Sequence, residues 1–263
     1  MIKNNMKKEK VLLGLLILLL VISPVLSAEF RTPNFIVTAE TPELAKEYAL
    51  AAEIYRKELA IEYFGKEIPR WGDRCPIDVR TGARLGAGGA TTFIFDHGEV
   101  FGWKMTIQGS KDSILGSVIP HEVMHMITAT HLRQPIPRWL DEGISTYMES
   151  DIEKRRHKIM LEEFLKSKPS RGIPFDLMFQ MKKYPADIMP VYAQGYSLTE
   201  FLIQQKGEKA FIQFIKDGVN LGNNPQAWID SLSKNYNFKN LGELQNVWNR
   251  WVAFGSPKMC QSV

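Results

Sequence analysis

The chain has 263 residues and a formal net charge of +4, from 33 lysines and arginines against 29 acidic residues. Four lysines and one glutamate within residues 1–10 contribute +3 of this charge, so only about +1 is left for the remainder. A nearly neutral chain without a basic run is a poor candidate for binding nucleic acid. The roughly 235 residues that follow residue 28 suffice for one large domain or two lobes with a substantial core.

The N-terminus has the order of a secretory signal peptide. Basic residues 1–10 precede an apolar run over residues 11–22, which Ser23 and Pro24 interrupt, and small residues then suit cleavage after Ser27 or Ala28. The apolar run is short for a membrane span. A retained N-terminal anchor is the alternative, because the cleavage site lacks a clean A-x-A. We expect residues 1–28 to direct export, so that the protein is secreted, periplasmic or associated with the cell envelope.

Cys75 and Cys260 are the only two cysteines in the chain. In an oxidising compartment they could form one disulfide that ties the C-terminal tail to the N-terminal part of the domain, and two unpaired buried thiols are the alternative.

Strand and helix signals alternate in the first part of the chain. FIVTA from Phe35 predicts a short strand, and a helix follows that Thr41 can cap, with Pro42 in its first turn and Gly65 at its end. Its buried face is predicted from helical spacing to hold Leu44, Tyr48, Ala52, Tyr55 and Leu59.

After this helix the hydrophobic residues recur at every second position, a pattern that is typical of strands. Ile77 and Val79 alternate with polar residues, and after the glycine-rich GARLGAGGA come TTFIF and VFGWKMTIQ, joined by a turn at HGE. The residues expected on one face of VFGWKMTIQ are Phe101, Trp103, Met105 and Ile107.

From Asp112 onward the pattern is almost wholly helical, with proline-containing breaks at 135–137, 169–174, 185–190 and 220–225. The sequence therefore predicts an α+β fold, with a mainly sheet lobe over 29–111 and a helical lobe over 112–263. Trp248, Trp251 and Phe254 are expected in the core.

HEVMH, residues 121–125, is the strongest functional signal. Residues four apart lie on one face of a helix, so the imidazoles of His121 and His125 can reach one ion. Glu122 can contact a metal-bound water without being a ligand itself. Catalytic zinc needs a third protein ligand and an open fourth position.

Two residues are candidates for the third ligand. His131 stands where the metzincin pattern HExxHxxGxxH has its third histidine, but Thr128 occupies the glycine position, and a β-branched residue resists the φ > 0 turn. If the helix continues instead, His131 lies about 15 Å along the axis from His121. Glu142 is the better candidate, because the prolines of RQPIPRWLDEG end the first helix and a second helix can bring its carboxylate to the ion. A His₂Glu set is a catalytic zinc arrangement.

HEVMH followed by PRWLDEG resembles the gluzincin metallopeptidases, in which a W-x-x-E-G segment brings the glutamate ligand. More closely, the run from GAGGATTFIFDHGEVFGWKM through both motifs to YAQGYSL, roughly residues 83–198, resembles the bacterial peptidase MA-like family. The resemblance implies a thermolysin-like zincin fold, a Zn²⁺ ion held by His121, His125 and Glu142, and Glu122 as general base. GAGGA lacks the acidic residue of the G-A-M-E-N-type strand found in aminopeptidases of the wider clan, so an endopeptidase is expected.

The predicted function is therefore zinc-dependent hydrolysis of peptide bonds in a peptide or protein substrate. The alternatives are a non-catalytic zinc-containing binding domain of the cell envelope, or a metzincin-type site that uses His131. An intact Glu122 argues against the non-catalytic reading, because a structural zinc site has no use for a base.

Several supporting residues are predicted less directly. Tyr192 in YAQGYS is the expected hydrogen-bond donor to the oxyanion, with Tyr196 as the alternative. Thr146 and Glu149 could orient metal ligands, although Glu149 could also be solvated. VFGWKMTIQ is either a strand that pairs with the substrate or an ordinary interior strand. A solvated helix face is expected at Arg155, Arg156 and His157.

Overall fold

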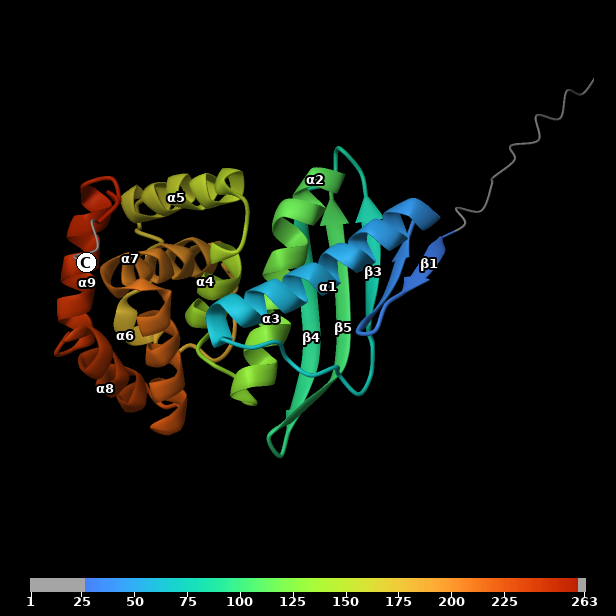
Figure 1. Ribbon diagram of the computed structural model, residues 1–263. Helices are drawn as coiled ribbons and strands as arrows, with labels where there is room; N and C mark the ends of the chain where they lie inside the picture. Colours follow the sequence, from blue (N-terminus) through green and yellow to red (C-terminus); the bar gives the residue numbers. More distant parts are fainter. Residues whose placement is uncertain (1–26, 260–263) are drawn as a thin grey trace, which may run out of the picture.

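The structure is a computed structural model that describes residues 27–259, and its strands form one mixed sheet in the order β1-β2-β3-β5-β4 (Figure 1). The central strands β2, β3 and β5 are parallel, and β1 and β4 are antiparallel strands at the two edges. The strands are β1 (Ala28–Arg31), β2 (Phe35–Ala39), β3 (Cys75–Thr81), β4 (Gly88–Asp96) and β5 (Glu99–Gly109).

Helix α1 (Pro42–Phe64) begins and ends at the residues that the sequence predicts. The Thr41 side chain accepts a hydrogen bond from the N–H of Leu44, and Gly65 ends the helix with φ of 81°, a left-handed conformation that favours glycine. Tyr48, Ala52 and Leu59 are buried as expected, and Leu44 and Tyr55 are partly buried. This helix packs on β1, β2 and α3 (Ile119–Leu132).

Among residues 27–259, helices cover one face of the sheet. In β3 and β5 the buried residues alternate with exposed ones, as a period of two requires. Helices α1 and α3 (Ile119–Leu132) both pack against the strands, so they lie on this buried face. The first helix of the predicted metal site is therefore supported directly by the sheet.

The prediction for β5 is wrong at Phe101, which is 43% exposed while Trp103, Met105 and Ile107 are buried. The pairing of β4 with β5 shifts between Thr92 and Ile94, and Gly102 has a positive φ of 69°. One extra residue in β5 reverses the alternation, so Phe101 lies on the other side of the strand.

The rest of the described chain is helical, as predicted, and the fold is α+β. Figure 1 shows α4 to α9 as a helical layer beside the sheet and its covering helices. Phe254 is the exception to the predicted core, with 80% exposure, whereas Trp248 and Trp251 are buried. The remaining elements are α2 (Lys111–Ser113), a π-helical turn η1 (Ile114–Val118), α4 (Arg138–Tyr147), α5 (Asp151–Lys166), α6 (Phe175–Met178), α7 (Met189–Asn220), α8 (Pro225–Tyr236) and α9 (Leu241–Ala253).

Glycines allow α4 and α7 to cross at close range. A Cβ on Gly195 of α7 would overlap the carbonyl oxygen of Trp139 on α4, and one on Gly143 would overlap the backbone of Gly195. Backbone at this distance cannot move aside as a side chain can. The crossing fixes the helix that carries Glu142.

We expect Gly195→Ala to destabilise the protein by about 1–3 kcal/mol or more, because the added methyl group has to push α4 and α7 apart. Chemical denaturation measures this change in the free energy of unfolding. Gly116→Ala is the matched control, since a Cβ there meets no atom within 4 Å and alanine favours helical backbone. Equal stability of the two variants would contradict the close crossing.

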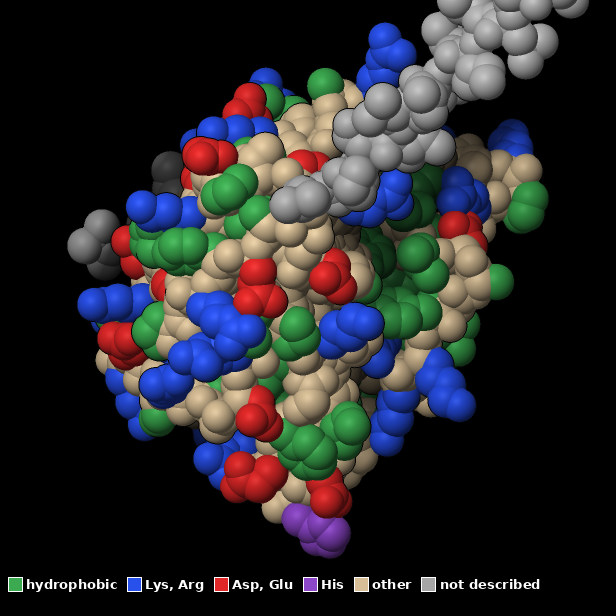
Figure 2. Space-filling view, turned by 90° about the vertical axis from the view of Figure 1, so that its right-hand side faces the viewer, with side chains coloured by type: hydrophobic (Ala, Val, Ile, Leu, Met, Phe, Trp, Pro, Cys, Tyr) green, Lys and Arg blue, Asp and Glu red, His purple; other side chains and the backbone are tan. Residues whose placement is uncertain are grey.

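Several predictions fall partly outside the described residues. Most of the predicted signal segment and Cys260 lie there, so the disulfide is untested, and Cys75 is buried at the start of β3. Within residues 27–259 we find no helix of the length and apolarity needed to cross a bilayer. On the face drawn in Figure 2, acidic and basic side chains are interspersed, in keeping with the small net charge.

Candidate metal centre

His121 and His125 lie one turn apart on α3, and their Nε2 atoms are 3.1 Å from each other. Both residues are buried, with 7% and 8% exposure. The π-helical turn η1 directly precedes this helix, where Pro120 has no N–H to continue the regular pattern. Because both side chains lie on one face of α3 and their Nε2 atoms are close together, the two imidazoles converge on one point between α3 and the helical layer.

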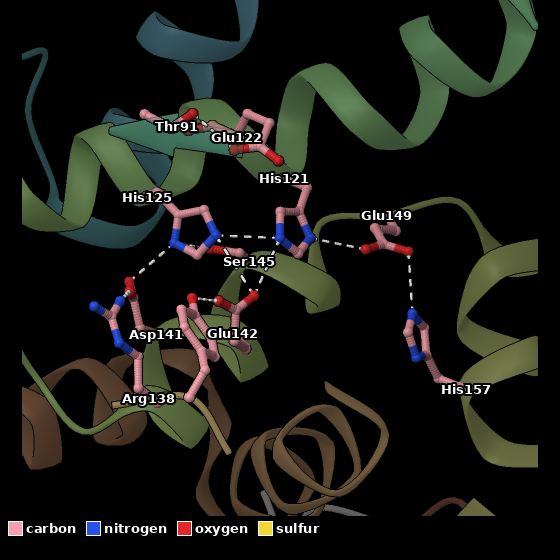
Figure 3. Close-up of polar contacts among 11 residues, drawn as sticks. Thr91, His121, Glu122, His125, Arg138, Asp141, Glu142, Ser145, Glu149 and His157 are labelled. Atoms are coloured by element: carbon pink, nitrogen blue, oxygen red, sulfur yellow. Dashed lines mark hydrogen bonds and ion pairs between the residues drawn. The ribbon is translucent and has the colours of Figure 1, made fainter. Parts of the chain in front are cut away.

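Glu142 comes to the same point from α4 (Figure 3). Its Oε2 lies 3.4 Å from Nε2 of His121 and 3.6 Å from Nε2 of His125. The side chain is fully buried, yet Oε2 has no hydrogen-bond partner. One ligand atom from each of the three residues lies within 4.8 Å of the other two.

The outer nitrogens of both imidazoles are held by carboxylates. Nδ1 of His121 is 2.8 Å from Oε1 of Glu149, and Nδ1 of His125 is 2.9 Å from Oδ1 of Asp141 (Figure 3). The Ser145 hydroxyl is also 3.1 Å from Nδ1 of His125. These contacts direct Nε2 of each ring toward Glu142, as outer carboxylates do at metal sites.

The sequence left two roles open for Glu149, a ligand-orienting group or a solvated side chain. The structure shows its carboxylate in contact with the His121 imidazole. No sequence motif indicated Asp141 or Ser145 as orienting groups, although Asp141 is the residue directly before Glu142. His157 was wrongly expected on a solvated face: it is buried, and its Nε2 lies 3.5 Å from Oε2 of Glu149. Arg155 and Arg156 are exposed as expected.

The electrostatics of the cluster favour a cation. Burial raises the pKa of Glu142, but the adjacent His125 and His121 lower it to about 2. Burial likewise raises the pKa of Glu149, while its hydrogen bonds with His121 and His157 bring it to about 2. Burial lowers the pKa of His121, but the neighbouring carboxylates of Glu142 and Glu149 raise it well above its usual value. Both carboxylates are therefore held in the charged form, which favours positive charge at the centre of the cluster.

The donor set fits zinc. Two imidazole nitrogens and one carboxylate oxygen form the ligand set of a catalytic zinc site with an open fourth position. The unpartnered Oε2 of buried Glu142 is the atom that such an ion would satisfy. The outer nitrogens are already engaged, so only Nε2 of each ring is free to bind.

Glu122 lies beside the cluster, next to the edge strand β4. The Thr91 hydroxyl donates to its Oε2 at 2.7 Å (Figure 3). A Cβ on Gly89 would overlap the Glu122 carboxylate, so the glycine-rich segment lets the strand approach it. Glu122 is buried but is not among the three convergent ligand residues.

His131 lies away from the cluster. Helix α3 continues through Thr128 to Leu132, so the chain makes no turn at the metzincin glycine position. The His131 ring stacks on Phe64 with 4.0 Å between centroids, and its Nδ1 is 3.0 Å from the carbonyl oxygen of Ile127. Its role in this structure is packing between α3 and α1.

Two tyrosines border the cluster. The Tyr192 ring is nearly parallel to that of His121, with 6.1 Å between centroids. The Tyr184 hydroxyl donates to Oε1 of Glu142, a contact that no sequence motif indicated. Burial and the Glu142 carboxylate raise the pKa of both phenols, which keeps them protonated. Tyr196 is buried further from the ligands, next to Tyr147 and His157.

Cavities lie on both sides of the cluster along β4. One has a volume of about 300 Å³ and is lined by Gly88, Gly89, His121, Glu122 and Tyr192, among others. A second, of about 340 Å³, is lined by residues that include Thr91, Phe93, Phe95, Arg138 and Tyr184. Each cavity is large enough for a side chain of a bound peptide.

The strand that borders these cavities is β4, which contains GGATTFIFD. VFGWKMTIQ belongs to β5, which pairs with β3 and β4 and is therefore interior. Of the two readings of VFGWKMTIQ, the interior strand is the one that the structure shows. The free edge belongs to the preceding strand.

Comparison with known protein families gives one finding. A family model described as the Peptidase MA superfamily matches residues 107–254, which include both ligand-bearing helices. The chain therefore belongs to the Peptidase MA superfamily, as its motifs predicted, and this membership supports a peptidase, of the metal-dependent kind typical of the superfamily. No curated protein matches the chain.

Proposed function

We propose that the protein is a zinc-dependent peptidase whose metal ligands are His121, His125 and Glu142. The unpartnered Oε2 of Glu142 carries the proposal, because a fully buried carboxylate oxygen facing two imidazole nitrogens needs a cation. A zinc ion held by these three residues would polarise the scissile carbonyl and lower the pKa of a water molecule.

Glu122 is the proposed general base. It accepts the proton of the attacking water and passes it to the nitrogen of the leaving amine. Its hydrogen bond with Thr91 fixes the carboxylate beside both the edge strand and the convergent ligands. A non-catalytic zinc domain has no need for a buried carboxylate in that place, so the contact favours an enzyme.

The substrate is proposed to be an extended polypeptide bound along β4, since an edge strand has free backbone groups for strand addition. Cavities on both sides of the cluster leave room for residues before and after the scissile bond, which favours an endopeptidase. The order of residues 1–28 supports export to the cell envelope or beyond. We propose residues 29–263 as the peptidase domain.

Metal analysis of the purified protein, together with cleavage of a random peptide library, tests this function. We expect about one zinc per chain, and hydrolysis that a chelator stops and added zinc restores. Protein that binds no divalent metal, or cleavage that persists after its removal, would refute the proposal.

Tyr192 is the proposed oxyanion donor. Tyr192→Phe removes only a hydroxyl group, so the ring can keep its place beside His121. We expect kcat to fall about 10²–10³-fold while zinc content and Tm change little. Tyr196→Phe is the matched control from the same helix. A loss of turnover in the Tyr196 variant alone would transfer the role to Tyr196, and full activity in both would place the donor elsewhere.

A further inference from the structure

Tyr184 gives the two carboxylate oxygens of Glu142 different surroundings. It lies in the segment between α6 and α7, 42 residues after Glu142, and its hydroxyl donates to Oε1. Oε2 has no hydrogen-bond partner and is the oxygen that faces His121 and His125. We propose that Tyr184 is a positioning residue that makes Glu142 offer a single oxygen to the metal; this inference rests on the proposed zinc site.

The number of oxygens that Glu142 offers matters for catalysis. A catalytic zinc site keeps one position open for water or substrate beside three protein ligands. A glutamate that binds through both oxygens would add a fourth protein contact and crowd this position. The Tyr184 hydroxyl uses one lone pair of Oε1, draws negative charge from that oxygen and holds the carboxylate with Oε2 toward the histidines. A turn to a two-oxygen mode would therefore weaken a buried hydrogen bond.

Tyr184 is itself held by the residues that orient His125. The Arg138 guanidinium lies over its ring, 4.6 Å from the centroid, and Arg138 Nη1 is 3.3 Å from Oδ2 of Asp141. Asp141 in turn contacts Nδ1 of His125 through its other oxygen. The backbone N–H of Arg138 also donates to the carbonyl oxygen of Met181, which fastens the segment to the start of α4. One connected set of contacts therefore orients two of the three ligands.

This placement also separates the roles of the two tyrosines. Tyr184 donates to a ligand oxygen, whereas Tyr192 lies beside the His121 ring and lines the cavity with Glu122. Burial is the main cause of the raised pKa of the Tyr192 phenol, and its hydrogen bond with Glu142 is a minor one. Loss of the Tyr184 hydroxyl should therefore act on the metal, and loss of the Tyr192 hydroxyl should act on turnover.

The test is Tyr184→Phe in the otherwise unchanged protein, which keeps the ring beneath Arg138. We expect zinc affinity, measured by competition with a chromophoric chelator, to fall about 10–100-fold. The cobalt-substituted variant should also show the weaker visible absorption of a higher coordination number, since Glu142 can then bind through both oxygens.

Tyr196→Phe is the matched control, because it removes a hydroxyl group from a buried tyrosine that lies against Tyr147 and His157, and it should keep parental zinc affinity and cobalt spectrum. Parental affinity and an unchanged spectrum in Tyr184→Phe would overturn the positioning role. Failure of the zinc site itself would look different, because the parent would then bind no zinc in the same competition assay.

Discussion

A Glu122→Gln variant is expected to keep its fold and its zinc and to lose about 10²–10⁴-fold in kcat. Glutamine has nearly the shape of glutamate, and its amide oxygen can still accept the hydrogen bond from Thr91. It cannot take up a proton from water at neutral pH. The variant keeps the proposed zinc site and the substrate cavities, so its loss in kcat measures the contribution of proton transfer by Glu122.

Turnover of a peptide found in the library screen measures this loss, and metal analysis and Tm establish that the site and fold are intact. Thr91→Val is a useful companion, because it leaves the carboxylate in place and removes only its hydrogen bond. We expect a much smaller loss there than in Glu122→Gln. Equal turnover of Glu122→Gln and the parent would exclude Glu122 as the base.

The parts of the fold set by local chemistry could be predicted from the sequence. Thr41, Pro42 and Gly65 act within a few residues of their own position, so the ends of α1 follow from residue type alone. The helical spacing of His121 and His125 likewise requires no knowledge of tertiary structure. Glu142 needed one further step, the expectation that prolines end α3 and allow a second helix to return.

Features that depend on distant contacts could not be predicted in the same way. The order β3-β5-β4 reverses the sequence order of the last two strands, which puts β4 rather than β5 at the edge. An extra residue in β5 moved Phe101 to the other side, and a bulge of this kind leaves the hydrophobic pattern almost unchanged. Sequence spacing alone cannot reveal either feature.

Sequence spacing also does not reveal the residues that orient the metal ligands. Asp141 and Glu149 reach the outer nitrogens of the histidines only because α3 and the chain around α4 pack at a particular angle. Tyr184 comes from an irregular segment with no periodicity to indicate where its side chain points. His157 is a polar residue on a largely exposed helix, and its partner Glu149 lies outside that helix.

Replacement of Glu142 by alanine is expected to lower zinc affinity by more than the roughly 10–100-fold loss that follows removal of an outer-shell hydrogen bond. Peptide hydrolysis should disappear with the metal. The reason is that Glu142 supplies the only oxygen of the ligand set, and two imidazoles alone leave the ion with half of its four positions filled. Glu142→Gln tests the same point without a cavity, since the amide retains the volume of the carboxylate.

His131→Ala is the matched control for the third ligand. It should keep parental zinc affinity and lose only stability, because the His131 ring packs on Phe64 and its Nδ1 faces a backbone carbonyl within α3. Competition with a chelator compares the variants on one scale, and circular dichroism checks their fold. If His131→Ala lost zinc while Glu142→Ala and Glu142→Gln kept it, the site would be of the metzincin type. That outcome would require α3 to break at Thr128, where the structure has continuous helix.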